Sequence, residues 1–453
     1  MSFAVLAASL LFWKMDAYAA STDVWVESSY VNVFQDSLKP EGAKTSIRLA
    51  AARNEFEAAQ VILRSDQAFT INSETFTNLT SGSNVIDSSN LKYQFVEYEY
   101  LNSNSHCDNV IERGAGYYPD ALSNATSISV AANKTQPIWI RAYIPKNIPA
   151  GIYTGTATII TSQGNYSVGI TIDVKNVTLP DSNAGNFDCA LWTQYCGPTS
   201  WYEPYDDMAI GFGVERYTPQ WWAIVGDIAQ KMKDYRNTTL TVNMCYLLMD
   251  GGTYKDSNGV YHFNWSKFDE VIQFFIDQGA VKRLEGVFIG QQQTSGRMMS
   301  EILDTNASGQ TFRTYVYPGS AASNAWIDQF IPALRDHLDE KGWTDMWWMH
   351  IGDEPGDAQV IADYKYLANR VKAAWNRDDL KLGDAMFSYG AATQLVRYPN
   401  IWIPITDMFE QNRTFFTNRQ ALGEEVWFYN CSSPRGMNLN RGIDQPVWMQ
   451  RAT

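Results

Sequence analysis

Two different periodicities of hydrophobic and polar residues divide the chain. Up to about residue 180, short runs rich in β-branched and aromatic residues are separated by Gly, Asn, Asp and Pro, with no long amphipathic helix between them. Runs of this kind lie at 24–26, 46–49, 59–63, 137–140, 156–160 and 167–174. Short strands with turn residues between them predict an antiparallel β-sandwich domain over residues 21–180.

From about residue 187 the pattern changes to an alternation of strands and helices. Apolar strands are predicted at 187–192, 239–246, 284–289, 346–351, 382–386, 401–405 and 426–429. Thr218 before Pro219 predicts the start of a helix, Ser266 with Asp269 predicts the start of the next, and Gly342 predicts a helix end. Alternating elements imply parallel strands with crossover helices. Seven such strands favour a (β/α)8-type barrel over an open sheet, so residues 181–453 are predicted to form this domain.

The predicted barrel is incomplete before its eighth strand. The sequence stops at Thr453, inside the expected seventh helix. A closed barrel needs an eighth strand, because an open sheet edge invites pairing with other chains. We therefore expect a fragment, with an unusual closing element as the alternative.

The N-terminal residues have the features of a targeting segment. An apolar stretch from Phe3 to Trp13 precedes the small residues Ala17 and Ala19, which predicts a signal peptide over residues 1–20 and a secreted or periplasmic protein. No later run is long enough to span a bilayer, so no membrane insertion is expected after signal removal. The five Cys are odd in number and lack zinc-type spacing, so neither a disulfide framework nor a metal site is predicted.

Composition narrows the class of ligand. The formal net charge is −14, and a nucleic-acid partner is excluded because it requires a basic footprint. No glycine-rich phosphate loop follows the first barrel strand, and no cofactor is expected. The 16 Trp, 25 Tyr and 21 Phe suit both a packed core and a site for flat, semi-apolar ligands such as sugar rings.

One short motif, HIGDEP at 350–355, places two neighbouring carboxyl groups at the carboxyl end of the fourth predicted barrel strand. Barrel enzymes build their active sites at that end. Burial and mutual repulsion both favour one protonated and one ionised carboxyl group in Asp353 and Glu354. Pro355 predicts an extended backbone at Glu354. A neutral acid beside an anion is the pair that glycosidic cleavage requires.

The adjacency of these acids bears on mechanism. In ordinary retaining glycosidases the two carboxyl groups flank the scissile bond, which neighbours in sequence cannot easily do. A substrate-assisted route removes that demand, because the 2-acetamido oxygen of the sugar attacks C1 itself. One carboxylate then orients the acetamido group while the other serves as acid/base. The alternative interpretation is a solvated pair at the start of the following helix.

Other residues at or beyond the predicted strand ends are candidates for binding a glycan. The aromatic members can stack on a sugar ring or pack in the core. His350 suits a pocket donor, an orienter of Glu354 or a satisfied strand histidine, and Asp407 suits a sugar contact or a helix cap. The substrate-binding candidates are Trp192, Tyr246, His350, Asp407, Tyr429, Asn430 and Arg441.

The acidic motif and several other segments of the chain resemble glycoside hydrolase family 123. The GDEP segment at 352–355 is similar to the catalytic pair of that family. The further similar segments are ARNEFEAAQ at 52–60, YPDAL at 118–122, PKNIPAGIYTG at 145–155, LWT at 191–193, FNWSKFD at 263–269 and WFYN at 427–430. The resemblance implies an exo-acting β-N-acetylgalactosaminidase, in which Asp353 stabilises the acetamido group and Glu354 is the acid/base.

Two alternatives stay open beside this hypothesis. One is a glycosidase of the same architecture that acts on another sugar with a conventional nucleophile, such as Asp407. The other is a glycan-binding surface protein without catalytic activity, which the incomplete barrel and the sandwich would both suit.

Overall fold

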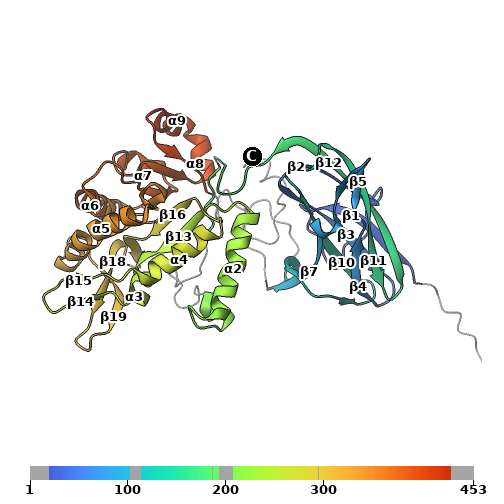
Figure 1. Cartoon of the computed structure of the whole chain (residues 1–453), viewed down its shortest axis with the longest axis horizontal. Coiled ribbons are helices and arrows are strands. Elements are labelled where there is room, and N and C mark those ends of the chain that lie inside the picture. Colours follow the sequence, from blue (N-terminus) through green and yellow to red (C-terminus); the bar gives the residue numbers. More distant parts are fainter. Residues whose placement is uncertain (1–19, 103–113, 186, 193–207, 294, 430–453) are drawn as a thin grey trace, which may run out of the picture. The chain divides into compact units, whose positions relative to one another are not determined.

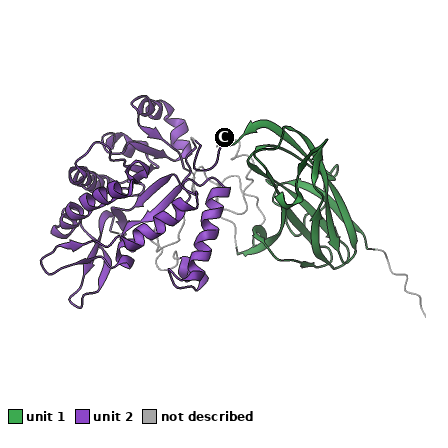
Figure 2. Cartoon of the chain, in the orientation of Figure 1, with its two compact units in different colours: residues 1–179, 440–451, 453 green, residues 180–439, 452 purple. Residues whose placement is uncertain are grey.

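The computed structural model describes residues 20–102, 114–185, 187–192, 208–293 and 295–429. These residues form two compact units, with the division between Leu179 and Pro180 (Figure 2). The predicted signal peptide falls outside the described residues except for Ala20. Residues 430–453, where the sequence predicts an interrupted barrel, also lie outside them.

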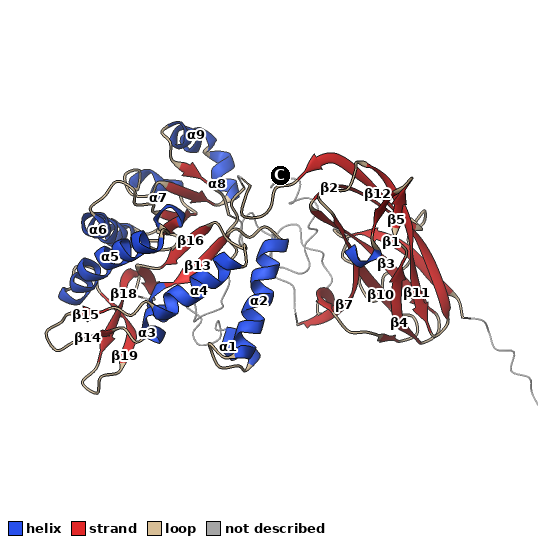
Figure 3. Ribbon diagram, viewed as in Figure 1, coloured by secondary structure: helices blue, strands red, loops and turns tan. Residues whose placement is uncertain are grey.

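The first unit is built from strands (Figures 1 and 3). Its elements are β1 Thr22–Ser28, β2 Ser46–Arg53, β3 Glu55–Ser65, β4 Phe69–Phe76, β5 Leu79–Ser81, β6 Asn84–Ile86, the short 3-10 helix η1 Ser88–Asn90, β7 Leu91–Leu101, β8 Gly116–Ser123, β9 Ile128–Val130, β10 Thr135–Ile144, β11 Gly151–Thr161 and β12 Gly164–Thr178. One sheet has the order β1-β3-β10-β7-β8, and the other has the order β2-β12-β11-β4-β9 with β5 and β6 attached to β11.

Alternating burial explains why these segments form a two-sheet domain. Along β12, Val168, Ile170, Ile172 and Val174 are buried, whereas the residues between them are exposed or half-buried. Side chains of a strand point alternately to opposite faces, so one face of β12 enters the core. All six predicted strand segments are confirmed. The expectation of a purely antiparallel sandwich is wrong at one edge, because β2 pairs with β12 in parallel.

The second unit alternates parallel strands with helices (Figure 3). Its helices are α1 Met208–Phe212, α2 Pro219–Asp234, α3 Met244–Gly251, α4 Ser266–Asp277, α5 Ala321–Lys341, the 3-10 helix η2 Thr344–Met346, α6 Ala358–Trp375, α7 Tyr389–Gln394, α8 Thr406–Gln411 and α9 Arg413–Ala421. Its strands are β13 Thr239–Asn243, β14 Tyr254–Lys255, β15 Tyr261–His262, β16 Arg283–Val287, β17 Gly290–Gln293, β18 Arg297–Thr305, β19 Thr311–Val316, β20 Trp347–Met349, β21 Gly383–Met386, β22 Ile401–Pro404 and β23 Glu425–Val426.

The parallel strands pair in chain order. β16 lies between β13 and β20, and β22 lies between β21 and β23. A parallel bridge from Met349 to Leu382 connects the two groups. The carboxyl ends of these strands therefore point the same way, and the motif at 350–355 follows directly after β20.

Most of the predicted helix ends are confirmed, and one is wrong. The Thr218 side chain caps α2, with Pro219 in the first turn, and Gly342 ends α5 in the left-handed conformation. Ser266 is not a cap: it is the first residue of α4, and no side chain caps that helix. Asp269, its expected partner, instead accepts a hydrogen bond from His337 at 2.6 Å.

Two strand predictions also need correction, and one sheet was not predicted. Residues 187–192 form no strand ladder, although the Cys189 carbonyl accepts hydrogen bonds from the amides of Thr238 and Thr239, at 2.9 and 3.1 Å. The strand predicted at 239–246 ends at Asn243, whose side chain caps α3, so Tyr246 lies on a helix. The antiparallel sheet β17-β18-β19, inserted between β16 and α5, was not predicted.

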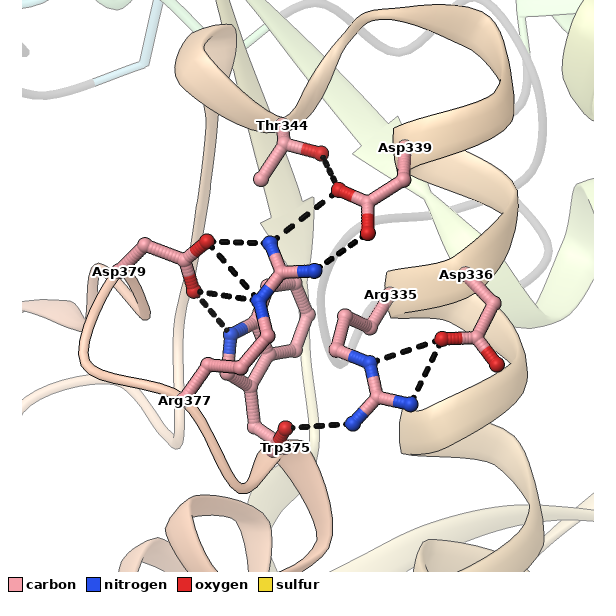
Figure 4. Close-up of polar contacts among 7 residues, drawn as sticks. All are labelled: Arg335, Asp336, Asp339, Thr344, Trp375, Arg377 and Asp379. Carbon is pink, nitrogen blue, oxygen red and sulfur yellow. Dashed lines mark hydrogen bonds and ion pairs between the residues drawn. The ribbon is translucent and has the colours of Figure 1, made fainter.

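An exposed charged cluster connects α5, η2 and the segment after α6 (Figure 4). The Arg377 guanidinium donates to Asp339 at 3.1 Å and to Asp379 at 3.0 Å. Asp339 also accepts from Thr344 at 2.6 Å, and Asp379 accepts from the Trp375 indole at 2.7 Å. These bonds fix the chain where it approaches β20 and β21.

Two further observations concern the predictions on cysteines and membranes. Cys189 is half-buried and Cys245 is buried, and both carry free thiols. The other three Cys lie outside the described residues. Within the described ranges, no helix is both long enough and apolar enough to cross a membrane.

Candidate active site

The two neighbouring acids sit on a loop at the end of a fully buried strand. Trp347, Trp348 and Met349 of β20 are at most 2% exposed, whereas Asp353 and Glu354 are half-buried. Both carboxyl groups therefore lie just beyond the buried strand, where the chain becomes partly exposed. Bulk water does not surround either of them.

Hydrogen bonds hold this loop from both sides. The buried Asp384 of β21 accepts from the amides of Ile351 and Gly352, at 3.4 and 3.1 Å. The Gln292 side-chain amide of β17 donates to the carbonyls of Asp353 and Glu354, at 2.7 and 2.8 Å. Side chains from two other strands therefore hold the loop: Asp384 binds the amides just before the pair, and Gln292 binds the carbonyls of the pair.

Glu354 has an unusual backbone conformation. Its φ is +47°, in the left-handed region, so the extended conformation predicted from Pro355 is wrong. A non-glycine residue there costs about 1–2 kcal/mol and persists only where its surroundings impose it. The two carbonyl hydrogen bonds from Gln292 lie on either side of this residue.

The side chain of Glu354 meets Tyr429, whose hydroxyl donates a hydrogen bond to the Glu354 carboxyl group. The backbone of Tyr429 is itself fixed, because its amide donates to the Pro404 carbonyl at the end of β22, at 3.0 Å. Tyr429 and Glu354, both singled out in the sequence, are thus brought into direct contact.

Electrostatics favour a proton on the carboxyl pair. Burial, followed by the neighbouring charge of Glu354, raises the pKa of Asp353 to about 7, against the opposing influence of His350. Two acids this close resist double ionisation, since each charge disfavours the other. Near neutral pH, the site can therefore hold one neutral acid beside one anion.

Beneath the loop, His350 forms the centre of a buried polar network. Its Nδ1 lies 3.0 Å from Asp384 Oδ1 and its Nε2 lies 2.6 Å from Glu285 Oε1 on β16. Burial by itself would lower the pKa of His350, but the bonds to the two carboxylates outweigh it and raise the pKa to about 10. His350 is therefore an imidazolium at neutral pH, and these contacts occupy both of its ring nitrogens.

The network extends in both directions. Asp384 also accepts a hydrogen bond from the Tyr364 hydroxyl of α6. Glu285 accepts from Thr241 of β13 at 3.2 Å and from the indole Nε1 of Trp192 at 3.1 Å. Neighbouring strands thus contribute to one hydrogen-bonded chain under the loop that carries Asp353 and Glu354.

Trp192 combines this buried anchor with an open face. Its side chain is 41% exposed, and its ring packs edge-on against Phe288 and His350, with centroids 5.7 and 6.1 Å apart. An aromatic ring held in this way offers a rigid surface for an apolar sugar face.

The remaining sequence candidates lie in other surroundings. Tyr246 is half-buried on α3, with the Arg313 guanidinium 4.6 Å from its ring centre. Asp407 lies in the first turn of α8, where its carboxylate accepts from the Met408 amide at 3.1 Å. Asn430 and Arg441 fall outside the described residues.

Sequence reasoning missed several residues that support the site, namely Glu285, Gln292, Tyr364 and Asp384. A usable signal existed for two of them. Asp384 is the one acidic residue of a fully buried strand, and Glu285 is the one acidic residue among the four buried residues that follow Arg283 in β16; a buried charge requires partners. Gln292 and Tyr364 carried no comparable signal.

The residues that the structure describes show no candidate metal centre. No three His, Cys, Asp or Glu side chains within those ranges are grouped to hold an ion. The described residues of this site offer carboxyl groups, a tyrosine hydroxyl and aromatic surfaces.

Comparisons with known proteins agree with this kind of site. Residues 201–453 match the family model for the glycoside hydrolase 123 catalytic domain, and residues 27–161 match the model for the glycoside hydrolase 123 N-terminal domain. The fold is similar to that of a family 123 glycoside hydrolase from Clostridium perfringens, solved in a study of glycolipid glycan hydrolysis. The TM-score is 0.72 at 16% identity, covering 94% of this chain and 74% of that one.

A second structure is much less similar. The family 20 exo-β-N-acetylglucosaminidase from Vibrio harveyi has a TM-score of 0.27 at 8% identity, covering 94% of this chain and 84% of that one. No curated protein sequence matches the chain. Because the catalytic-domain model alone spans more than half of the sequence, the protein belongs to glycoside hydrolase family 123.

Proposed function

We propose that this hydrolase is secreted and removes terminal β-linked N-acetylhexosamine, with N-acetylgalactosamine as the expected sugar, by a substrate-assisted retaining mechanism. The observation that carries the proposal is the arrangement of two half-buried acids on one constrained loop, with the pKa of Asp353 raised to about 7. Neighbouring acids approach C1 from one side, which suits a reaction in which the sugar supplies its own nucleophile. The glycolipid glycan hydrolysed by the Clostridium perfringens enzyme is a candidate natural substrate.

In the first step, the acetamido oxygen forms a bond to C1 as the bond from C1 to the leaving oxygen breaks. The carboxyl pair holds one proton near neutral pH; in the reacting form this proton lies on Glu354, which gives it to the leaving oxygen as a general acid. Ionised Asp353 accepts a hydrogen bond from the acetamido N–H and stabilises the positive charge that develops on the cyclised group. Tyr429 holds the Glu354 carboxyl group in place through its hydroxyl.

In the second step, water attacks C1 and gives a proton to the Glu354 carboxylate, now a general base. The acetamido oxygen leaves C1 and the amide is restored. Two successive inversions at C1 return the original anomeric configuration.

Other residues have supporting roles in this proposal. Trp192 offers its exposed ring to the sugar, whereas His350 acts through the buried network rather than by touching the substrate. Tyr246, Asp407, Asn430 and Arg441 remain proposed sugar contacts. The parallel strands belong to a (β/α)8-type barrel in this proposal, and residues 1–20 direct export.

Substrate assistance can be tested by changing the sugar alone. We expect a phenyl N-acetyl-β-galactosaminide to be hydrolysed at least about 10³-fold faster than phenyl β-galactoside, because a neighbouring nucleophile has a very high effective concentration. Fluorination of the acetamido methyl group should slow cleavage progressively, since it weakens the attacking oxygen. Initial rates over the series measure both effects. Equal rates on the acetylated and non-acetylated sugars would contradict the mechanism.

A further inference from the structure

The Gln292 side chain makes a contact that the reaction steps do not use. Its single amide nitrogen donates to two successive carbonyls, those of Asp353 at 2.7 Å and Glu354 at 2.8 Å. The two carbonyls flank the φ and ψ angles of Glu354. The same contact therefore spans the one residue of the loop that has a positive φ, +47°.

The sheet that carries Gln292 is itself anchored to the loop. The Gly290 amide donates to the Ile351 carbonyl at 2.8 Å, and the Ile289 amide donates to the His350 carbonyl at 3.2 Å. Gly352 allows a close approach, because a Cβ there would lie 2.4 Å from the Met298 sulfur on β18. The amide of Gln292 thus comes from a backbone already fixed against the segment that precedes the acids.

A second anchor ties this sheet to the helix after the catalytic loop. Arg297 of β18 forms a two-point contact with the Asp363 carboxylate of α6, at 2.6 and 2.7 Å. The Met298 amide donates to the same carboxylate at 3.2 Å. The sheet is thus bound to chain segments on both sides of the acids, so that the donor of Gln292 has little freedom to move.

We propose that Gln292 is a positioning residue whose side-chain amide holds Glu354 in its left-handed backbone conformation and so directs the Glu354 carboxyl group to the scissile oxygen. This inference rests on the proposed role of Glu354 as acid/base. Asp384 fixes the amides before the pair, and Gln292 fixes the carbonyls of the pair. The contact from Gln292 thus opposes a return of the Glu354 backbone to the extended conformation that Pro355 favours.

The test replaces the donor and keeps its bulk. Gln292→Met preserves length and removes the N–H groups, with Gln292→Ala as a second variant. Gln293→Met is the matched control, because it makes the same change one residue along β17. Thermal unfolding of every variant reports its stability.

The readout is kcat/KM on two aryl N-acetyl-β-galactosaminides. A phenyl leaving group needs a proton from Glu354, whereas a 2,4-dinitrophenyl group leaves as a stable anion. Misplacement of an acid by about 1 Å can cost about 100-fold, so we expect that loss for the phenyl substrate in Gln292→Met and little loss for the dinitrophenyl substrate. The ratio between substrates does not depend on the folded fraction of a variant, since unfolding lowers both rates equally.

Three outcomes separate this inference from the proposed function. A leaving-group-dependent loss in Gln292→Met and Gln292→Ala, absent from Gln293→Met, supports the positioning role. If Glu354→Gln shows the leaving-group dependence but the Gln292 variants lose activity equally on both substrates, or not at all, the positioning role of Gln292 is overturned. If Glu354→Gln itself lacks that dependence, Glu354 is not the acid, and both the proposed function and this inference fail.

Discussion

The substitution Asp353→Asn is expected to lower kcat/KM on a phenyl N-acetyl-β-galactosaminide by about 10²–10³-fold, the usual effect of losing a preorganised electrostatic contact. The asparagine keeps the shape of the side chain but cannot carry a negative charge against the developing positive charge of the acetamido group. Steady-state kinetics on the purified variant measure the loss. Cleavage of substrates without an acetamido group should not respond to the same change.

Asp407→Asn is the matched control for that substitution. Asp407 lies in the first turn of α8, and its carboxylate accepts a hydrogen bond from the next amide. We expect a much smaller loss of kcat/KM in this variant, because a sugar contact at Asp407 would not face the developing positive charge. The reverse result, with Asp407→Asn inactive and Asp353→Asn active, would favour the conventional nucleophile of the alternative hypothesis.

The pH profile gives an independent check on Asp353. Its pKa is raised to about 7 by burial and by the neighbouring Glu354, and the mechanism needs its ionised form. For the 2,4-dinitrophenyl substrate, whose leaving group needs no proton, the wild-type kcat/KM should therefore decline as pH falls below about 7. In Glu354→Gln the repelling charge is gone, so the acid limb for the dinitrophenyl substrate should move to lower pH. An unmoved limb would mean that another group titrates there.

The sequence predicts the scaffold of this enzyme better than the details of its site. The buried residues of β12 alternate with exposed ones, and the β20 residues form a short apolar run, so hydrophobic pattern alone locates both kinds of strand. The position of Asp353 and Glu354 follows from the second pattern, because the strand ends directly before them. These features depend on local sequence, which is why they could be predicted.

The inserted β17-β18-β19 sheet has no such local signal. In β18, residues on both faces are buried, and Ser300 and Glu301 are among them, so its sequence shows no clean period of two. The chain before it, Gly290–Gln293, is largely polar. These strands are stabilised by contacts with distant segments, such as that between Arg297 and Asp363, which no local pattern reveals.

The conformation of Glu354 shows the same limit at one residue. Pro355 disfavours helical conformations before it and led to an extended prediction, yet φ is +47°. Hydrogen bonds from Gln292, more than 60 positions away in the chain, override that preference. Positions where tertiary contacts override local rules are often functional, as the proposed mechanism requires here.

Removing Asp384 is expected to cause the largest loss of stability. Asp384→Ala should lower the free energy of unfolding by about 3–5 kcal/mol, as for a buried ion pair that loses one partner. The change leaves the His350 imidazolium with Glu285 alone and removes the acceptor for Tyr364 and for the Gly352 amide. Urea denaturation measures the difference. Asp379→Ala, which removes an exposed carboxylate from the Arg377 cluster, should cost far less, and equal losses would contradict a buried charged network.

The same network makes stability depend on pH in a definite direction. The pKa of His350 is about 10 in the folded protein against about 6.5 in an unfolded chain, so its contribution is complete below pH 6.5 and disappears as pH rises toward 10. The raised pKa of Asp353 acts with the same sign, because the folded protein keeps a proton that the unfolded carboxyl group has lost. In Asp384→Asn, His350 retains only Glu285 as a charged partner, so its pKa should be lower. Unfolding free energies between pH 6 and 10 should then fall less steeply for Asp384→Asn than for the wild type, whereas parallel curves would show that His350 is not the titrating group.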